Sequence, residues 1–444
     1  MKRCLLIALC LNTLVAVAQP GAKPNILIIL ADDLGTGDVS CFGGKNIRTP
    51  NIDQLSAEGL RLTQFYANST VCSPTRAALL TGRYPDLAGV PGVIRQQKQN
   101  SWGFLNDELP MMPSFFKPAG YHTALIGKWH LGYKAPHLPN QKGFDLFKGF
   151  LGDMMDDYYT HRRDGINWMR HNDAEIDPQG HATDIFANWT IEYLSQRKKQ
   201  SKPFLLYLAF NAPHFPIQPP AEWLKKIKER EPEISPARAA NIALVEHMDH
   251  AIGRIIEALK QNNQYNNTII LFTSDNGGSL PHAQSNGELN GGKQDMLEGG
   301  IRVPTIAVWK NHIQSGSISN RPGMSMDLLP TVAAMTGTNL KGSFDGISLW
   351  SDWQTGKEKD DRTLFWVRRE GPPHAGLAYY AARKGSFKIL QNNPFQPFQL
   401  YDLEKDPLEK QPLKTAGDPH YKELVGELME HIRKSGAVPW QGRE

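Results

Sequence analysis

The chain has 444 residues, of which 40% are hydrophobic and 21% are charged, a balance typical of globular proteins that excludes an intrinsically disordered chain. Its 49 lysines and arginines against 45 acidic residues leave a net charge of +4, too balanced for a nucleic-acid-binding arm or a polybasic membrane anchor. A chain of this length predicts one large domain with an appendage, or two domains.

The first residues have the pattern of a secretory signal peptide. Two basic residues, 2–3, precede an apolar run over 5–17, which closes on Ala-Val-Ala at Ala18. We therefore expect residues 1–18 to direct export to the periplasm or the medium, with cleavage near Ala18. A lipid anchor at Cys10 is the alternative, which the bulky Leu9 disfavours. The run is shorter than the roughly 20 residues of a spanning helix and no later run reaches that length, so we expect no membrane span.

Patterns of buried strands recur through most of the chain. Short continuous apolar runs occupy residues 25–30, 123–126, 204–210, 268–272 and 303–308. Such runs are typical of parallel strands covered on both faces. Residues 239–260 instead carry apolar side chains at three- and four-residue steps, which predicts an amphipathic helix. The alternation predicts an α/β fold, with a large, mostly parallel mixed sheet sandwiched by helices, as a catalytic domain over 24–340.

Oxygen-bearing side chains come directly after two of these runs: Asp32, Asp33, Asp275 and Asn276. The carboxyl ends of strands are where open α/β sheets bind their ligands. Asp32 and Asp33 alone could cap a helix, but a second such pair favours a shared site. Hard oxygen donors suit Ca²⁺ or Mg²⁺, and three carboxylates with one amide favour calcium. In contrast, we interpret His247, Asp249 and His250 as ordinary helix-face residues rather than metal ligands.

Beyond residue 341 the pattern changes to shorter segments separated by turns. Residues 363–367, 377–382 and 387–390 read as strands, and 421–434 as an amphipathic closing helix. These segments predict a C-terminal subdomain over 341–444, an antiparallel sheet plus a helix. No internal repeat is found.

Removal of the leader would leave two cysteines, Cys41 and Cys72, too few for a disulfide scaffold in an exported protein. Taken alone, they would form one bridge or remain two buried thiols. The residues around Cys72 favour another use, because it opens the motif Cys72-Ser-Pro74-Thr-Arg76, with Thr-Gly-Arg ending at Arg83.

This motif resembles the signature of the formylglycine-dependent sulfatases of the alkaline phosphatase superfamily. Further blocks follow in that family's order: Asp32-Asp33 before it, then Gly127-Lys128-Trp-His130, Ala212-Pro-His214, Thr273-Ser-Asp275-Asn276-Gly-Gly278, Lys293 and Gly299-Gly-Ile-Arg302-Val-Pro304. The similarity spans most of the chain beyond the leader. It implies a sulfatase. Export, ten tryptophans and polar loops favour sulfated sugars or polysaccharides as substrates, with aryl sulfates as the alternative.

The resemblance implies that a maturation enzyme, which recognises Pro74 and Arg76, oxidises Cys72 to formylglycine. The hydrated aldehyde carries two oxygens on one carbon, one to attack sulfur and one to expel sulfate. Residue 72 would thereby join the ligands of one Ca²⁺, which are Asp32, Asp33, Asp275 and Asn276. Arg76 is expected to hold the formylglycine oxygens.

The resemblance also implies roles for four further residues. Lys128 and Lys293 bind sulfate oxygens from opposite sides. His130 serves the nucleophile oxygens as a base, and His214 is the general acid toward the leaving oxygen. We expect Arg302 to be structural.

Other functions share parts of this pattern. A phosphatase or phosphonate monoester hydrolase of the same superfamily would commonly carry Asp-His in place of Asp275-Asn276, and a zinc site would need more histidines. A non-catalytic carbohydrate-binding protein or a calcium store would not need the full set of nucleophile, acid and metal ligands. The region that varies with substrate is expected to include Asp156, Asp157, His161, Arg162 and Arg163, as sugar contacts or as a solvated charged loop.

Overall fold

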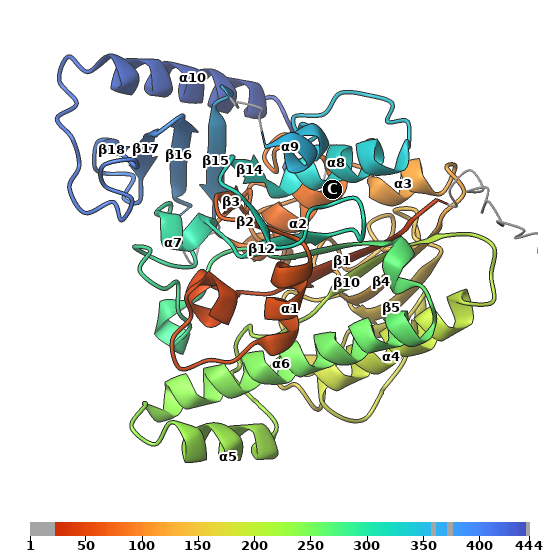
Figure 1. Cartoon of the computed structure of the whole chain (residues 1–444). Coiled ribbons are helices and arrows are strands. Elements are labelled where there is room, and N and C mark those ends of the chain that lie inside the picture. Colours follow the sequence, from red (N-terminus) through yellow and green to blue (C-terminus); the bar gives the residue numbers. More distant parts are fainter. Residues whose placement is uncertain (1–22, 357–360, 371–375, 441–444) are drawn as a thin grey trace, which may run out of the picture.

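A ten-stranded mixed sheet is the framework of the computed structural model, which describes residues 23–356, 361–370 and 376–440 (Figure 1). The five central strands are parallel and stand in the order β11 (Thr268–Ser274), β1 (Asn25–Ala31), β10 (Phe204–Ala209), β4 (His122–Lys128) and β5 (Leu146–Phe150). Beyond β11 lie β12 (Thr305–Val308), β2 (Leu60–Leu62) and β13 (Ser317–Ser319), and beyond β5 lie β8 (Met169–His171) and β9 (Ala174–Glu175). The mixed, mostly parallel sheet expected from the sequence is confirmed. The predicted signal peptide lies outside the described residues.

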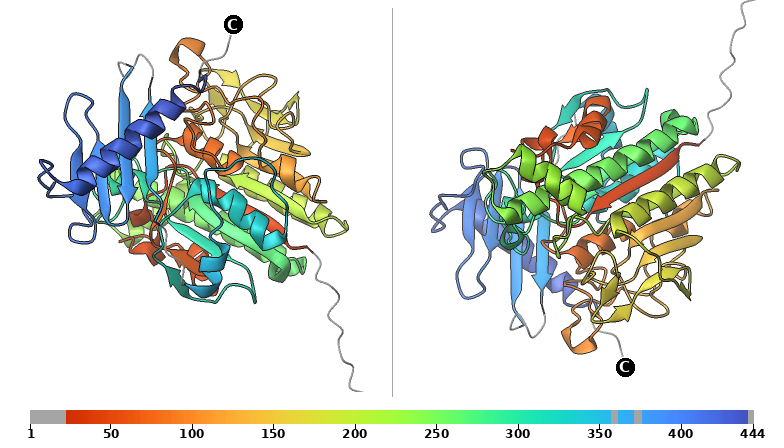
Figure 2. Two further views of the ribbon diagram at one scale, coloured as in Figure 1. Left: turned by 90° about the horizontal axis from the view of Figure 1, so that it is seen from above. Right: turned by 90° about the horizontal axis from the view of Figure 1, so that it is seen from below.

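Helices cover both faces of this sheet (Figure 2). One face carries α1 (Pro50–Glu58), α4 (Ala182–Arg197), α5 (Ala221–Arg230) and α6 (Pro236–Gln261), and the other carries α2 (Cys72–Thr81), α3 (Met112–Phe116), α8 (Leu328–Thr336) and α9 (Trp350–Thr355). Successive side chains of β1 alternate between the two cores, so Leu27 and Ile29 pack under α6 while Ile28 packs on the side of α2. The predicted helix over 239–260 is part of α6, which begins earlier because the Ser235 hydroxyl caps it.

The C-terminal residues form the predicted antiparallel sheet, with one strand more than expected. Its order is β15 (Leu364–Arg369), β16 (Ala378–Lys384), β17 (Phe387–Gln391) and β18 (Gln399–Asp402), and α10 (Pro419–Ser435) packs on one face. The other face packs toward α2, where Trp366 donates its indole N–H to the Ala67 carbonyl at 2.8 Å. Helix α2 is therefore held between the large sheet and the small one.

Short elements complete the described chain. Two two-stranded pairs join β3 (Phe65–Tyr66) to β14 (Gly323–Met324) and β6 (Arg162–Arg163) to β7 (Ile166–Asn167), and α7 (Glu298–Ile301) precedes β12. In the described part of the chain, no helix has both the length and the apolar character that crossing a bilayer requires.

Candidate active site

The oxygen-bearing residues predicted as a site meet at one edge of the large sheet. Asp32 and Asp33 follow β1, and Asp275 follows the adjacent β11, whose last residue pairs in register with the last residue of β1. Lys128 ends β4 on the other side of β10. Parallel strands bring these ends together, because successive strands present the same end to the same edge of the sheet.

Each carboxylate of this edge is paired with one cationic side chain. The guanidinium of Arg76 donates to Asp275 Oδ2 from Nε at 3.0 Å and from Nη2 at 2.6 Å. Lys128 Nζ donates to Asp32 Oδ2 at 2.5 Å, and Lys293 Nζ donates to Asp33 Oδ2 at 2.8 Å. The three cations thus arrive from α2, β4 and the loop before α7. Five of the six side chains are almost fully enclosed, and that of Lys293 is 15% exposed.

The pKa values of the Asp32 and Asp275 carboxyl groups are shifted in opposite directions by burial and by neighbouring charges. Burial raises the pKa of Asp275 to about 7, and the charge of Asp32 adds to the rise, while Arg76 only partly opposes it. Burial also acts to raise the pKa of Asp32, but Lys128, His214 and Arg76 outweigh it and hold that pKa well below its usual range. The three cations match the three carboxyls in number, but burial still disfavours the ionised form of Asp275, which a further positive charge would favour.

Two oxygens of the cluster are suited to bind a cation. Asp32 Oδ1 and Asn276 Oδ1 are buried and accept no hydrogen bond from any described residue. Asn276 uses its amide N–H instead, donating to Asp33 Oδ1 at 2.8 Å. Buried acceptors without a donor are costly, whereas a divalent cation would satisfy both oxygens at once. The donor set is all oxygen, which suits a hard cation.

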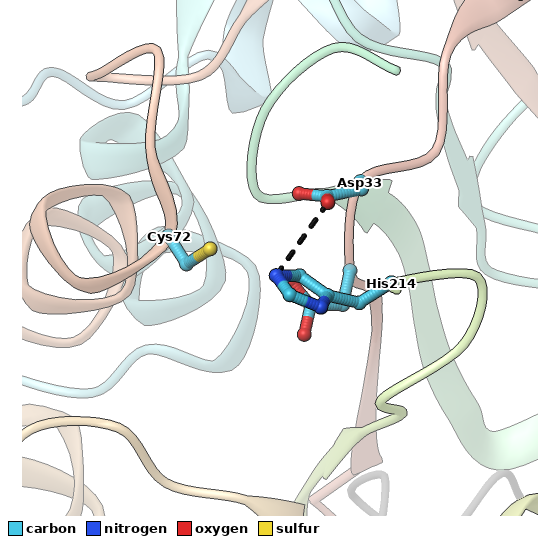
Figure 3. A group of neighbouring side chains, drawn as sticks. Asp33, Cys72 and His214 are labelled. Carbon is cyan, nitrogen blue, oxygen red and sulfur yellow. Dashed lines mark ion pairs between the residues drawn. The ribbon is translucent and has the colours of Figure 1, made fainter. Parts of the chain in front are cut away.

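Cys72 lies beside this cluster as the first residue of α2. It is buried, its thiol is free, and so is that of Cys41, the other cysteine of the described chain. A carboxylate oxygen of Asp32, one of Asp33, the sulfur of Cys72 and a ring nitrogen of His214 all lie within 4.8 Å of one another. Figure 3 shows the sulfur directed into the space between the Asp33 carboxylate and the His214 ring. Burial raises the pKa of the Cys72 thiol, so an unmodified thiolate is disfavoured here.

His130 is held in an orientation that leaves one ring nitrogen free. Its backbone adopts the left-handed region at φ 58°, and its Nε2 donates to the Ile94 carbonyl at 3.0 Å. Its Nδ1 is buried and has no partner among the described residues. Burial lowers the pKa of this imidazole, and Lys128 and Arg76 lower it further, so the ring is neutral with Nδ1 as the proton acceptor.

His214 stands on a tight turn that follows β10. Its Nδ1 donates to the Phe215 carbonyl at 2.7 Å, and its Nε2 lies 3.6 Å from Asp33 Oδ2, the ion pair dashed in Figure 3. Burial lowers the pKa of the imidazole, with Lys293 acting in the same direction and Asp33 in the opposite one. Because Nδ1 uses its proton on the Phe215 carbonyl, Nε2 carries a proton only in the charged form of the ring, which burial disfavours and Asp33 favours.

One residue that supports this turn was missed by sequence reasoning. The hydroxyl of Tyr158, buried in the core, donates to the carbonyls of Asn211 at 2.7 Å and His214 at 2.9 Å. Gln218 accepts the Tyr158 backbone N–H at 2.8 Å and so links the two loops again. Tyr158 directly follows Asp156 and Asp157, which were candidates for sugar contacts, but no sequence motif distinguishes it from an ordinary buried tyrosine.

The loop that carries Lys293 has a strained backbone. Gln294 adopts φ 83°, a left-handed value that is unfavourable for a residue with a side chain. Its N–H donates to the Thr70 carbonyl at 3.0 Å, and its carbonyl accepts from Arg368 Nη1 at 3.0 Å. Arg368 belongs to β15 and is itself held by Glu370 at 3.1 Å. The C-terminal sheet therefore contributes directly to holding Lys293 in place.

The other residues named as candidates from the sequence, Arg302 and those of the loop after β5, lie apart from the cluster or bind one another. Arg302 donates to the Thr63 carbonyl, as a structural residue would. Arg163 pairs with Asp153 and Asp156, and Arg162 pairs with Asp177 in a bidentate contact. His161, a buried loop residue, donates from Nε2 to the Gly180 carbonyl at 3.0 Å, and Asp157 accepts from Gln218.

His247 and Asp249 of α6, interpreted above as helix-face residues rather than metal ligands, make structural contacts. His247 contacts Asp184 at 3.1 Å between α6 and α4, and Asp249 accepts from the backbone N–H of Ile52. Asp184, His247 and His181 lie close enough to hold a metal ion. Both ring nitrogens of His181 are already engaged, however, with the Thr183 N–H and with the Gln218 carbonyl.

Comparison with known proteins gives consistent matches. Residues 24–338 match the family model described as Sulfatase, and residues 291–437 match the one described as N-sulphoglucosamine sulphohydrolase, C-terminal. The N-acetylgalactosamine-6-sulfatase of Sus scrofa is 32% identical over 466 residues, covering 95% of this chain and 86% of that protein.

Solved structures agree with this result. A crystal structure of Ps i-CgsB in complex with k-i-k-neocarrahexaose is 32% identical, with a TM-score of 0.86 over 95% of each chain. The phosphonate monoester hydrolase of Agrobacterium radiobacter is 21% identical, with a TM-score of 0.64 over 94% of this chain and 96% of that one, which is a likeness of fold alone.

Proposed function

Because this chain belongs to the sulfatase family of the alkaline phosphatase superfamily, and is therefore a sulfuric ester hydrolase, we propose that it desulfates carbohydrates by means of a formylglycine made from Cys72 and one Ca²⁺. The observation that carries this proposal is the convergence of the buried Cys72, the acidic cluster and three cationic side chains at one edge of the sheet. Relatives that act on or bind sulfated saccharides support the substrate class.

The proposed modification explains why a buried cysteine stands at the centre of the site. The thiol itself has a raised pKa and would be a poor nucleophile. A hydrated aldehyde at this position would supply both an attacking oxygen and a second oxygen from which sulfate is eliminated. The motif from Cys72 to Arg76 supports recognition by a maturation enzyme, which would have to act before folding because Pro74 and Arg76 are buried.

The proposed Ca²⁺ would be held by Asp32, Asp33, Asp275, Asn276 and the modified residue 72. The three cationic side chains already balance the three carboxylates, so a divalent ion would leave the centre positive for an anionic substrate. When bound, it would draw charge from a sulfuryl oxygen as a Lewis acid. Its ligands are oxygens, with no histidine pair of the kind that zinc sites use.

The cationic residues and histidines then have separate tasks. Lys128 and Lys293 approach the cluster from different elements and would bind sulfate oxygens once the cation takes their present carboxylate partners. Arg76 would hold the oxygens of residue 72. The free Nδ1 of His130 would accept a proton from those oxygens, and His214 would protonate the leaving oxygen.

The role of Lys293 predicts an effect of Arg368, which contacts the loop but not the cluster. Arg368→Met should raise the KM for sulfate esters and the inhibition constant of inorganic sulfate by about tenfold, because the strained Gln294 backbone loses a charged donor. Steady-state kinetics with sulfate as inhibitor measures both constants. Arg362→Met, which removes the ion pair to Asp327 at the other end of the small sheet, is the matched control and should change neither constant. Equal effects of the two variants would show only a loss of stability.

The role of His214 predicts a dependence on the leaving group. A sugar alkoxide needs protonation as its S–O bond breaks, whereas an acidic phenol leaves as a stabilised phenolate. His214→Ala should therefore lose most of the about 10²–10⁴-fold that general acids contribute on a sugar sulfate, and much less on an activated aryl sulfate. The measurement is kcat/KM for both substrates.

His130→Ala is the comparison for this experiment, because a base acting on residue 72 serves every substrate. It should impair both reactions alike. Equal losses for His214→Ala on sugar and aryl sulfates would remove the assignment as general acid and leave His214 as a sulfate-binding residue.

The phosphatase or phosphonate monoester hydrolase activity remains the alternative within the superfamily. Parallel assays of sulfate and phosphate release separate it from the proposal, using a panel that includes N-acetylgalactosamine 6-sulfate and sulfated carrageenan oligosaccharides. The proposal requires sulfate release from a member of this panel. Faster phosphate release from matched phosphate esters would favour the alternative.

Export and domain division complete the proposal. We propose export on the signal peptide pattern of residues 1–18. The division into a catalytic domain over 24–340 and a C-terminal subdomain over 341–444 is likewise a proposal, although Arg368 shows that the second part also supports the site.

A further inference from the structure

An exposed aromatic pair stands at the edge of the active site without an assigned task. The ring of Phe215, the residue after His214, stacks on the imidazole of His282 with centroids 4.6 Å apart and planes inclined by 25°. Phe215 is 43% exposed, although rings of this size are usually covered in a folded protein. This ring directly follows His214 in the chain and is open to solvent, so it is available to a ligand at this side of the site.

Two further contacts connect the segment that carries His282 with the loop that carries Lys293. His282 ends the short helix η5 (Leu280–His282), where its Nδ1 is 2.8 Å from the Ser279 hydroxyl. Burial lowers the pKa of His282, and the charges of Asp33 and Lys293 both act on this ring. Its neighbour Leu280, half exposed, lies over Gly292, the residue before Lys293. The aromatic pair and Leu280 thus border the cluster on the side of His214 and Lys293.

We propose that Phe215, supported from behind by His282, binds the apolar face of the pyranose ring that carries the sulfate. The inference rests on the proposed function, since it takes the leaving oxygen to be on a sugar. That oxygen must meet His214 Nε2, and its sugar ring is only one or two bonds away, which brings the ring beside the next residue, Phe215. A pyranose presents one face of C–H groups, which an open aromatic ring covers favourably, while its hydroxyls stay in water.

The platform predicts a loss of affinity without a loss of chemistry. Phe215→Ala should raise the KM for a sugar sulfate about tenfold, with kcat within about twofold of the unmodified sequence, whereas Phe215→Trp should keep the original KM. Inorganic sulfate has no sugar ring, so its inhibition constant should not change. Phe395→Ala is the matched control, because Phe395 is 84% exposed in the loop between β17 and β18.

Each outcome decides the question. An unchanged KM in Phe215→Ala would overturn the platform, and so would a parallel rise in the inhibition constant of inorganic sulfate, which would mean that the His214 turn had moved. The platform is supported if the KM rises in Phe215→Ala but not in Phe215→Trp, and if the inhibition constant of inorganic sulfate changes in neither variant. Failure of the unsubstituted protein to release sulfate from any sugar would instead contradict the proposed function, so the two failures are distinguishable.

Discussion

Replacement of Cys72 by serine should leave a protein that binds sulfated substrate but does not turn it over. Serine could attack sulfur, but its single oxygen would remain esterified, because there is no second oxygen on the same carbon to expel the sulfate. Removal of a covalent nucleophile typically costs on the order of 10⁶-fold in kcat. Multiple-turnover assays should therefore detect no sustained sulfate release, while calorimetry detects binding.

Cys41→Ser is the matched control for this variant. Cys41 is the other free thiol of the described chain, partly exposed at η2 (Ser40–Phe42), with its carbonyl accepting from Arg61 and no contact to the acidic cluster. It should retain full activity and a similar melting temperature. Multiple turnovers by Cys72→Ser at a rate close to that of the Cys41→Ser protein would refute the proposed chemistry at residue 72.

Removal of the proposed divalent cation should be almost as damaging as the Cys72→Ser substitution. A Lewis acid at a sulfuryl oxygen contributes several kcal/mol to the transition state, so chelation should lower kcat by about 10³-fold or more. The Asp32 and Asn276 oxygens that lack donors would be left unsatisfied, and the carboxylates would repel one another. The melting temperature should fall with the activity, because the cation binds only the folded chain.

Metal replacement makes this prediction specific. Calcium added to the chelated protein should restore activity and melting temperature, and zinc should restore them less well, since the site offers oxygen ligands. Elemental analysis should find one calcium per chain. Two zinc ions per chain would favour the phosphatase alternative instead. Full activity after exhaustive chelation would contradict the proposed catalytic cation.

The parts of this site that could be predicted from sequence depend on strand ends and local motifs. Asp32 and Asp275 are far apart in the chain, but each directly follows a buried parallel strand, and such strands end at a common edge. Cys72 and Arg76 are one helical turn apart, so a single short motif brings both to the site. The α/β fold class follows from the same apolar runs.

The parts that could not be predicted depend on tertiary contacts between loops. Tyr158 supports His214 through a hydroxyl bonded to two carbonyls, and backbone acceptors leave no signature in the sequence. The same holds for Arg368, whose partner is the Gln294 carbonyl. The strand β18 was missed because Gln399–Asp402 is short, and its pairing with β17 is what makes it a strand.

The most direct test of the account is the mass of the tryptic peptide 62–76 from active protein, which contains Cys72 as its only cysteine. Preparations with different specific activities should be compared. The account predicts an aldehyde in place of the Cys72 thiol, in a fraction that rises in proportion to specific activity. A fully active preparation in which this peptide carries only unmodified Cys72, or a disulfide to Cys41, would contradict it.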